Sequence, residues 1–414
     1  MSAFSRPAVD SDAILGVRPK TVFEPSTIEE AAEAIRESAS GGKTLAFVGG
    51  GTDLELGFPP KSLDAVVRTA RMARVVEHAP SDQIVIVEAG MTLGGLQATL
   101  ASHRQRLALD PPLPGRKTMG GIIAANAYGP RRARFGTIRD LIIGISFVRA
   151  DGTLARGGGK VVKNVAGFDL PKLMVGSLGT LGLISTATFR LHPLPEQEAT
   201  LRLSGLTAAA VRSLVRGMRE AQLEPTSVVA AWKEAGRFDV VVRFEGFRAG
   251  VAEQRDRLAG LVRKEPEGAC ETLDEPAAGA FWSRHDELRT APALRAKLTA
   301  LPTHIEPITN DILPGLLATL GGPSFLWYAT LGLGFLAGEP ADAGTDSAAR
   351  AIQSARKRVA GFGGTLTIQA APAAIRERLD VWGPPPPSLP LMQSVKSRLD
   401  PEARLAPGRF VGGI

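Results

Sequence analysis

The sequence predicts an α+β protein with two domains, and three features of the chain lead to this prediction. A helix delivers the chain to a short apolar strand and then to a glycine turn near residue 50. Two more glycine-rich segments follow before residue 195, among short strands and helices. From about Glu198 the pattern changes to strand, helix, strand runs that occur twice, as in a doubled β-α-β unit.

The predicted first lobe covers about residues 19–106 and begins with a helix. Ser26 and Glu29 match a capping box, in which two side chains satisfy free amides at the start of a helix. Gly41 and Gly42 end this helix, because glycine is common at helix C-termini. The elements expected after it are strands at 44–48, 65–69 and 84–88 and a helix from a Thr92 cap to about residue 103.

Three consecutive glycines, residues 49–51, follow the first apolar strand and precede Thr52 and Asp53. Glycine tolerates positive φ and has no Cβ, so several backbone N–H groups can converge on an anion there. A diphosphate is the natural ligand of such a turn. An ordinary glycine-rich turn between strands is the alternative explanation.

Two better-known phosphate loops do not fit this part of the chain. A dinucleotide fingerprint needs a third glycine where Leu54 stands, and Phe58-Pro59-Pro60 prevents a helix soon afterwards. Gly42-Lys43-Thr44 resembles the end of a Walker A loop, but Glu37 occupies the place of its first glycine. The sequence therefore argues against an NAD-type Rossmann site and against a P-loop.

The predicted second lobe, about residues 107–195, contains the other two glycine-rich segments. In the first, residues 114–129, small residues would let a ligand lie close against a turn and a short helix. A hairpin with a turn at Asp151-Gly152 separates it from the second, residues 176–184. Close helix packing is the alternative explanation for both segments.

Residues 196–383 form the predicted second domain, and residues 384–414 a C-terminal segment that returns to the first. A stiff proline run at 384–387 and a helix at 391–399 make up most of that segment. Residues 338–346, rich in Gly, Ala, Pro and Asp, are expected to be a mobile loop. The elements expected in the second domain are strands at 199–203, 227–232, 239–244, 295–299, 325–330 and 366–370 and helices at 207–220, 251–263, 310–320 and 348–360.

Composition excludes several other classes of protein. The formal charge of +7 comes from scattered basic residues, and aromatic residues make up only 5% of the chain, which argues against a nucleic-acid-binding protein. Cys270 is the single cysteine and no Cys/His cluster has metal-ligand spacing, so no metal site is expected. No signal-peptide pattern and no run of 18 apolar residues occurs. We expect a cytoplasmic protein, with any membrane contact peripheral and made through a partner.

The three glycine-rich segments together resemble the FAD-binding domain shared by vanillyl-alcohol oxidase and p-cresol methylhydroxylase (PCMH-type), which also occurs in FAD-linked 2-hydroxy acid dehydrogenases. The resemblance covers about residues 19–195 and implies a two-lobed FAD-binding domain with a ferredoxin-like α+β cap domain. In that family all three segments line FAD. Carried over by motif, the residues implied to face FAD are Phe47, Val48, Gly49, Gly50, Gly51, Thr52, Asp53, Pro114, Gly115, Thr118, Gly120, Gly121, Ala125, Asn126, Ala127, Tyr128, Gly179, Thr180, Leu181, Gly182, Leu183 and Ile184.

Departures from the family pattern narrow the resemblance. Catalytic members carry a glutamate where Leu178 stands, and a His-x-Gly-Asp-Gly-Asn-x-His segment that this chain lacks. Both departures resemble the smaller FAD-binding subunits of bacterial glycolate oxidases, as does the closing Pro407-Gly408-Arg409. The first loop offers Thr52 and Asp53 where covalently tethered members place a histidine, so we expect non-covalent FAD.

No residue supports a firm catalytic assignment. His304 could act as a base and Arg284 with His285 could grip a carboxylate, but a structural histidine and a solvated helix face are the alternatives. Lys160 and Lys163 could neutralise flavin or phosphate charge, or lie in a surface loop. Trp327 and Tyr328 should point to opposite faces of a strand. Cys270 is read as a spectator.

The resemblance implies an FAD-binding subunit of a glycolate oxidase complex, a 2-hydroxy acid dehydrogenase. Its expected partners are a larger FAD-linked subunit and an iron–sulfur subunit that passes electrons to membrane quinones. The complex would place it at the inner face of the membrane. Two alternatives stay open: a self-sufficient FAD-dependent dehydrogenase of a small 2-hydroxy acid such as D-lactate, and a non-catalytic assembly subunit.

Overall fold

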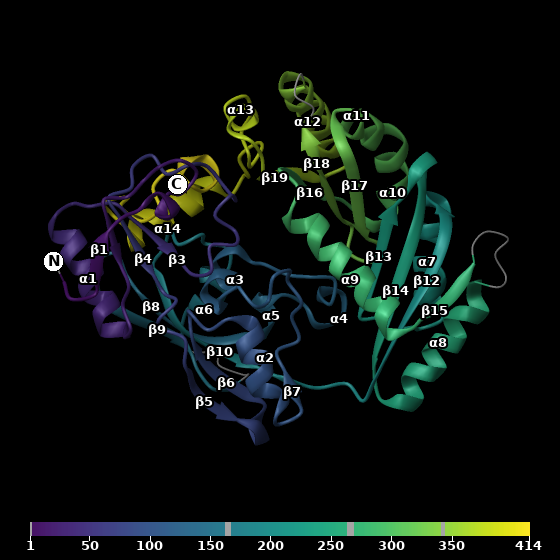
Figure 1. Cartoon of the computed structure of the whole chain (residues 1–414), viewed down its shortest axis with the longest axis horizontal. Coiled ribbons are helices and arrows are strands. Elements are labelled where there is room, and N and C mark those ends of the chain that lie inside the picture. Colours follow the sequence, from purple (N-terminus) through teal and green to yellow (C-terminus); the bar gives the residue numbers. More distant parts are fainter. Residues whose placement is uncertain (1, 162–166, 263–268, 341–343) are drawn as a thin grey trace. The chain divides into compact units, whose positions relative to one another are not determined.

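The computed structural model describes residues 2–161, 167–262, 269–340 and 344–414 (Figure 1). The chain divides into two compact units. The first comprises residues 1–128, 136–194 and 384–414, and the second comprises residues 129–135 and 195–383. Residues 129–135 were expected to belong to the FAD-binding domain, but they group with the second unit. Arg131 helps to explain this grouping, because it forms an ion pair with Glu245 in the sheet of the second unit.

The first sheet of the first unit has four strands in the order β1 (Ser5–Pro7), β2 (Thr21–Phe23), β4 (Ala65–Arg68), β3 (Leu45–Val48). Helix α1 (Ile28–Ser40) packs Ala31, Ala34 and Ile35 against it. The expected capping box of Ser26 and Glu29 is not formed. Thr27 is the N-cap that accepts from the amide of Glu30, while the Glu30 carboxylate accepts from the amide of Ser26.

The second sheet has five antiparallel strands, β5 (Val75–Ala79), β6 (Ile84–Glu88), β10 (Leu183–Arg190), β8 (Ile142–Val148) and β9 (Leu154–Gly158), in that order. The predicted lobe boundary at 106/107 is therefore wrong. Strand β6 was assigned to the first lobe, yet it pairs with β10, with Glu88 opposite Thr186. Local sequence patterns identify a strand but not its distant partner.

Short helices cover this sheet and form one apolar core with it. Leu96, Ile122, Ile145 and Phe189 are among its buried side chains. The remaining elements of this part are α2 (Leu93–Ala101), β7 (Gln105–Arg106), α3 (Met119–Ala125), α5 (Ile138–Leu141), α6 (Leu170–Met174) and β11 (His192–Pro193), with η1 (Asp10–Asp12) and η2 (Pro80–Asp82) before them.

The second unit is built on an eight-stranded antiparallel sheet in the order β15-β12-β14-β13-β17-β18-β16-β19. Helix α9 (Glu275–Thr290) and strands β15 (Cys270–Leu273) and β18 (Leu333–Pro340) are among the elements that the sequence did not predict, and residues 338–340 belong to β18 and not to a loop. The strands are β12 (Gln197–Thr207), β13 (Ser227–Trp232), β14 (Arg237–Gly246), β15 (Cys270–Leu273), β16 (Leu294–Thr299), β17 (Leu320–Tyr328), β18 (Leu333–Pro340) and β19 (Thr365–Ala370). The helices are α4 (Arg132–Phe135), α7 (Ala208–Glu220), α8 (Arg248–Val262), α9 (Glu275–Thr290), α10 (Ile305–Pro307), α11 (Leu313–Leu317), α12 (Thr345–Ala360) and α13 (Ala373–Arg376), with short turns η3 (Glu234–Gly236), η4 (Pro302–His304) and η5 (Ile308–Ile312).

Helix α9 covers the face of this sheet that carries Tyr328. The hydroxyl of Tyr328 lies 2.8 Å from Nε2 of His285 and accepts from Arg289 at 2.9 Å. Trp327, the neighbouring residue in β17, therefore points to the opposite face. Both aromatic side chains are buried.

The end of the chain completes the first unit. Helix α14 (Leu389–Leu399) packs Val395 and Leu399 against the core of the five-stranded sheet. Lys396, on the same helix, forms a buried ion pair with Asp400 and donates to the carbonyls of Thr180 and Leu405. A short turn, η6 (Val411–Gly413), ends the chain. Residues distant in sequence from the glycine segments are thus tied to them.

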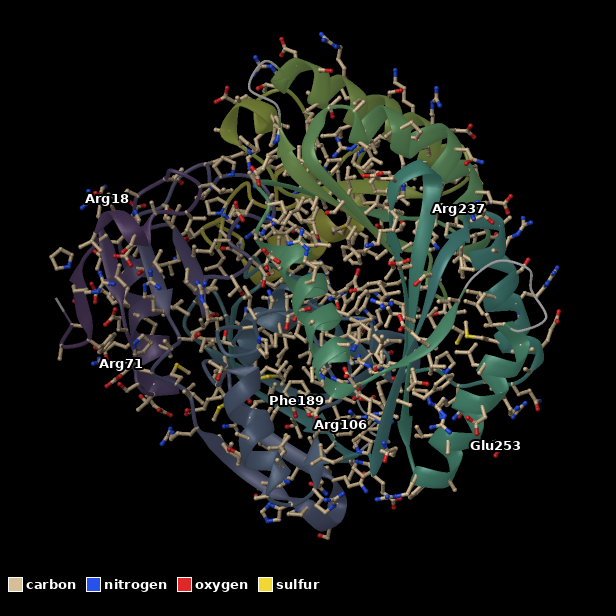
Figure 2. All side chains as sticks on the ribbon, turned by 45° about the vertical axis from the view of Figure 1, so that its right-hand side comes forward. Arg18, Arg71, Arg106, Phe189, Arg237 and Glu253 are labelled. Carbon is tan, nitrogen blue, oxygen red and sulfur yellow. The ribbon has the colours of Figure 1, made fainter. Side chains whose placement is uncertain are left out.

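The structure confirms the predicted α+β class. Exposed arginines are spread over both units, as Arg18, Arg71 and Arg237 illustrate in Figure 2. Among the helices that the structure describes, none is long and apolar enough to cross a membrane.

Candidate functional site

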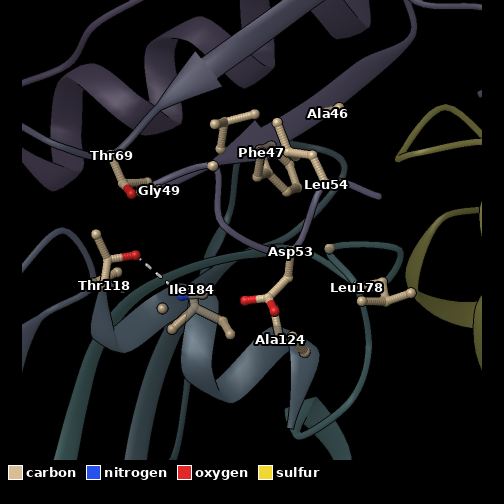
Figure 3. Close-up of a pocket in the computed structure, with 18 of the residues that line it drawn as sticks. Ala46, Phe47, Gly49, Asp53, Leu54, Thr69, Thr118, Ala124, Leu178 and Ile184 are labelled. Atoms are coloured by element: carbon tan, nitrogen blue, oxygen red, sulfur yellow. Dashed lines mark hydrogen bonds between the residues drawn. The ribbon is translucent and has the colours of Figure 1, made fainter. Parts of the chain in front are cut away.

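A cleft in the first unit brings the three glycine-rich segments together (Figure 3). Its volume is about 820 Å³, counting space open to solvent. The predicted residues that line it are Phe47, Val48, Gly49, Gly50, Gly51, Thr52, Asp53, Thr118, Gly120, Gly121, Ala125, Gly179, Gly182, Leu183 and Ile184. The sequence spacing of these segments gave no distance between them, so their meeting in one cleft is a result of the fold.

The glycine loop, residues 49–53, lies directly on the segment that leads into α3. A Cβ added at Gly49 would come within 2.0 Å of Oγ1 of Thr118, and one added at Gly50 would come within 1.8 Å of the Arg116 carbonyl oxygen. Gly51 has φ +70°, a conformation that side chains rarely adopt. Close approach explains the first two glycines and backbone conformation explains the third.

The amides of the glycine loop are available to a ligand. Over the residues that the structure describes, the N–H groups of residues 50–53 donate to no protein acceptor. Successive unbonded N–H groups next to a left-handed glycine form an anion-binding nest. These residues therefore fit a diphosphate group such as that of FAD.

The amides at the start of α3 are already used by the protein. The N–H of Met119 donates to the Met91 carbonyl at 2.8 Å, and that of Gly120 donates to the Ala89 carbonyl at 2.8 Å. The N–H of Gly121 donates to the hydroxyl of Thr118, the N-cap. The helix start thus supplies shape to the cleft, while the glycine loop supplies the anion donors.

The third segment is attached to the end of α3. The amides of Gly176 and Leu178 donate to the carbonyls of Ile123 and Ala124, both at 2.9 Å. Gly179 follows with φ +74°, and a Cβ there would meet the ring of Phe47 at 3.2 Å. Hydrogen bonds to α3 and contact with Phe47 place this segment against the other two.

Two charged side chains lie in the wall of the cleft, Asp53 and Arg409. Figure 3 shows Asp53 extending from the glycine loop toward α3. Its carboxylate forms an ion pair with the buried Lys117, whose ammonium also donates to Thr52 Oγ1 at 3.2 Å. The ion pair offsets a negative charge that would otherwise oppose a diphosphate.

Some predicted residues lie outside the cleft lining, and some lining residues were not predicted. The contact of Pro114, Gly115, Asn126, Ala127, Tyr128, Thr180 and Leu181 with FAD stays a prediction. The lining residues missed from sequence are Ile14, Ala46, Leu54, Thr69, Ala89, Ala124, Leu178, Ala406 and Arg409. Most of these are apolar or small residues without a distinctive motif. Arg409 belongs to the closing Pro407-Gly408-Arg409 motif, but no feature of the sequence predicted that it would lie beside the glycine loop.

None of the catalytic candidates from the sequence lines this cleft. Arg284 is exposed and paired with Glu287 at 2.6 Å, and Lys160 is paired with Glu77 at 2.6 Å. His285 is buried against Tyr328, and the ring of His304 lies 4.8 Å from that of Phe362. Lys163 lies outside the described residues. No group of three or more potential metal ligands occurs among the residues that were described.

Comparison with known proteins identifies the cofactor of this chain. A family model described as FAD binding domain matches residues 19–158, which contain the glycine loop and α3. Residues 19–158 are thus similar to FAD-binding domains. FAD is the cofactor of this chain, and the amide nest agrees with that cofactor.

Two curated relatives are similar to this chain over part of its length. Glycolate oxidase subunit GlcE of Escherichia coli (strain K12) is 30% identical over 255 residues, which cover 61% of this chain and 66% of the relative. A D-lactate dehydrogenase of Archaeoglobus fulgidus is 37% identical over 174 residues, which cover 42% of this chain and 38% of the relative. The matches thus span less than two thirds of either relative.

A solved structure extends the likeness of this FAD-binding chain to its second unit. Alkyldihydroxyacetonephosphate synthase has a TM-score of 0.74 and 16% sequence identity, and the match covers 95% of this chain and 76% of the other. At that identity the likeness shows the fold alone. It supports the predicted architecture for both units.

Proposed function

We propose that this chain is the FAD-binding subunit of a glycolate oxidase complex and carries electrons from the oxidation of glycolate to glyoxylate. The observation that carries the proposal is a cleft whose amide nest fits the FAD diphosphate but whose described lining contains no histidine. The similarity to glycolate oxidase subunit GlcE supports the choice of substrate. A non-covalent cofactor agrees with Thr52 and Asp53 in the glycine loop.

The chain's own residues account for cofactor binding and not for substrate chemistry. FAD, when bound, would supply a redox centre that can accept electrons and pass them on. The glycine loop would hold the diphosphate, and residues 178–184 with α3 would form the wall that orients the rest of the cofactor. Oxidation of a 2-hydroxy acid also needs a base for the hydroxyl proton and a cation for the carboxylate. The described lining contains no histidine or lysine, and its charged side chains are engaged within the protein, Asp53 by Lys117 and Arg409 by the carbonyls of Leu54 and Leu56.

Because the described cleft offers no histidine or lysine for substrate chemistry, we propose that a partner subunit supplies these groups. A larger FAD-linked subunit would bind and oxidise the substrate, and an iron–sulfur subunit would pass electrons to membrane quinones. The chain would then be cytoplasmic and reach the inner face of the membrane through the complex. In this arrangement its own FAD relays electrons or supports assembly.

A self-sufficient dehydrogenase of a small 2-hydroxy acid is the second candidate function. The similarity to a D-lactate dehydrogenase favours it. The second unit also holds a polar cluster, in which Tyr328 contacts both His285 and Arg289. A third candidate, a non-catalytic assembly subunit, conflicts with the intact amide nest.

Anaerobic spectroscopy separates these functions. The purified chain is expected to be yellow and to release its flavin on denaturation, since no covalent bond is proposed. Addition of glycolate or D-lactate should leave the flavin oxidised in the isolated chain, and adding the larger subunit should allow glycolate to bleach it. Bleaching of the isolated chain by either acid would instead establish the dehydrogenase. Colourless protein that cannot be reconstituted with FAD would favour the assembly role.

A further inference from the structure

The last residues of the chain frame the glycine loop on both sides. Within the C-terminal segment, residues 404–409 lie beside β3, the strand that leads into the loop. The amide of Leu45 donates to the Arg404 carbonyl at 2.9 Å, and the amide of Ala406 donates to the Leu45 carbonyl at 2.6 Å. On the far side of the loop, the amide of Phe58 donates to the Arg409 carbonyl at 3.0 Å. The same segment therefore contacts the chain before and after the nest.

The side chain of Arg409 forms hydrogen bonds to residues that directly follow the glycine loop. This side chain lines the cleft, and the residue is only 4% exposed. One of its terminal nitrogens, Nη2, donates to the carbonyls of Leu54 at 2.9 Å and Leu56 at 2.8 Å. Leu54 is the first residue after the nest and also lines the cleft.

We infer that Arg409 positions the glycine loop for the FAD diphosphate. Carbonyls turned toward the guanidinium fix the peptide groups that follow residues 50–53, so those amides stay directed into the cleft. The guanidinium suits this task because its donors are planar and fixed, while a lysine ammonium is a single flexible point. A positive charge in the cleft wall also favours an anionic ligand.

Arg404 provides a matched control within the same segment. It is also buried, at 6% exposure, and its Nη2 also donates to a backbone carbonyl, that of Ala150, at 2.6 Å. Arg404 does not line the cleft. Removing either side chain takes a buried arginine from the C-terminal segment, but of the two only the Arg409 side chain is bonded to the residues that follow the glycine loop.

The test measures binding of FAD and of ADP to the full-length apoprotein by calorimetry. ADP carries a diphosphate but no isoalloxazine, so it reports on the nest. Arg409→Met is expected to weaken both ligands by a similar factor, about ten- to hundredfold, since charged hydrogen bonds that shape the loop are lost. Arg409→Lys should fall between Arg409→Met and the native chain. Arg404→Met should change both dissociation constants by less than about threefold, although its thermal midpoint falls.

Native-like binding of FAD by Arg409→Met would overturn the inference. Equal losses in Arg409→Met and Arg404→Met would also overturn it, because they would show a general effect of the C-terminal segment. If Arg409→Met does not fold, Arg409→Lys against Arg404→Lys gives the same comparison. The inference rests on FAD binding and not on the proposed substrate, so failure of glycolate to reduce the complex would leave it standing.

Discussion

Two glycine-rich segments meet in the same cleft, yet their backbone amides differ in whether they are hydrogen-bonded within the protein. In the glycine loop, the described structure gives the amides of residues 50–53 no protein acceptor. At the start of α3, the amides of residues 119–121 all donate to protein oxygens. Glycine content alone therefore does not identify an anion site. What distinguishes the two is whether the amides are already satisfied.

The glycines of the second segment serve close packing. A Cβ at Gly120 would come within 2.8 Å of the Ala89 Cβ and 3.1 Å of the Ala89 carbonyl. This contact lets α3 lie against the end of β6 and forms one wall of the cleft. Both explanations considered for glycine-rich segments, ligand binding and close packing, thus apply in one site at different positions.

The largest expected effect comes from a methyl group at the loop. In Gly50→Ala the new Cβ meets the Arg116 carbonyl, which is backbone and cannot move aside, so the loop must shift. Overpacking of this kind costs about 1–3 kcal/mol, and we expect FAD affinity to fall by up to about 100-fold. Flavin fluorescence titration of the apoprotein measures it. Gly260→Ala is the control, since a Cβ there meets nothing within 4 Å and Gly260 lies outside the cleft lining, and equal affinity in the two variants would contradict the assignment.

The charge beside the loop gives the next effect. Lys117→Met removes the partner of Asp53 and leaves an uncompensated carboxylate next to the diphosphate site. We expect FAD affinity to fall about tenfold at low salt, and the loss to shrink as salt screens the repulsion. The double variant Asp53→Asn/Lys117→Met should recover most of the affinity. A double variant as weak as Lys117→Met would show that repulsion is not the cause.

The sequence predicted the chemistry of the loop better than the position of its neighbours. Strand β3 and the three glycines were recognisable because apolar runs and glycines act over a few residues. The pairing of β6 with β10 and the contact of Arg409 with Leu54 join residues far apart in the chain, and no local pattern encodes them. Helix α9 was missed as part of the core because Arg284 and His285 were considered for carboxylate binding or for a solvated helix face, although His285 is buried.

Low pH is expected to destabilise the N-terminal residues that form one side of the cleft, because Asp12 then becomes protonated. The Arg6 guanidinium, with that of Arg68, holds the pKa of Asp12 well below its usual range. A carboxyl with a lowered folded-state pKa stabilises above its unfolded pKa of about 3.9, and this contribution is lost as pH falls below it. We expect Asp12→Asn to lower the free energy of unfolding at pH 7 by about 1–3 kcal/mol. The further decrease in this free energy between about pH 5 and 2 should be smaller in the variant than in the native chain.

Urea unfolding across this pH range measures the effect of Asp12. Asp10→Asn is the control, because the Asp10 side chain is 94% exposed and should change stability by less than about 0.5 kcal/mol. Parallel pH profiles for the native chain and Asp12→Asn would show that the ion pairs of Asp12 do not contribute to stability.

The smallest effect tests the other side of the comparison, the start of α3. Thr118→Val removes the hydroxyl that accepts from Gly121 while keeping the shape of the side chain. Loss of such a cap costs about 1 kcal/mol of stability. FAD affinity should change less than about threefold, since the amides of α3 are bonded within the protein. Thr92→Val is the matched control, because Thr92 caps α2 in the same way, accepting from Gly95 at 3.1 Å outside the cleft lining. If Thr118→Val weakened FAD tenfold while Thr92→Val did not, the α3 start would bind the anion after all, and the distinction between free and satisfied amides would fail.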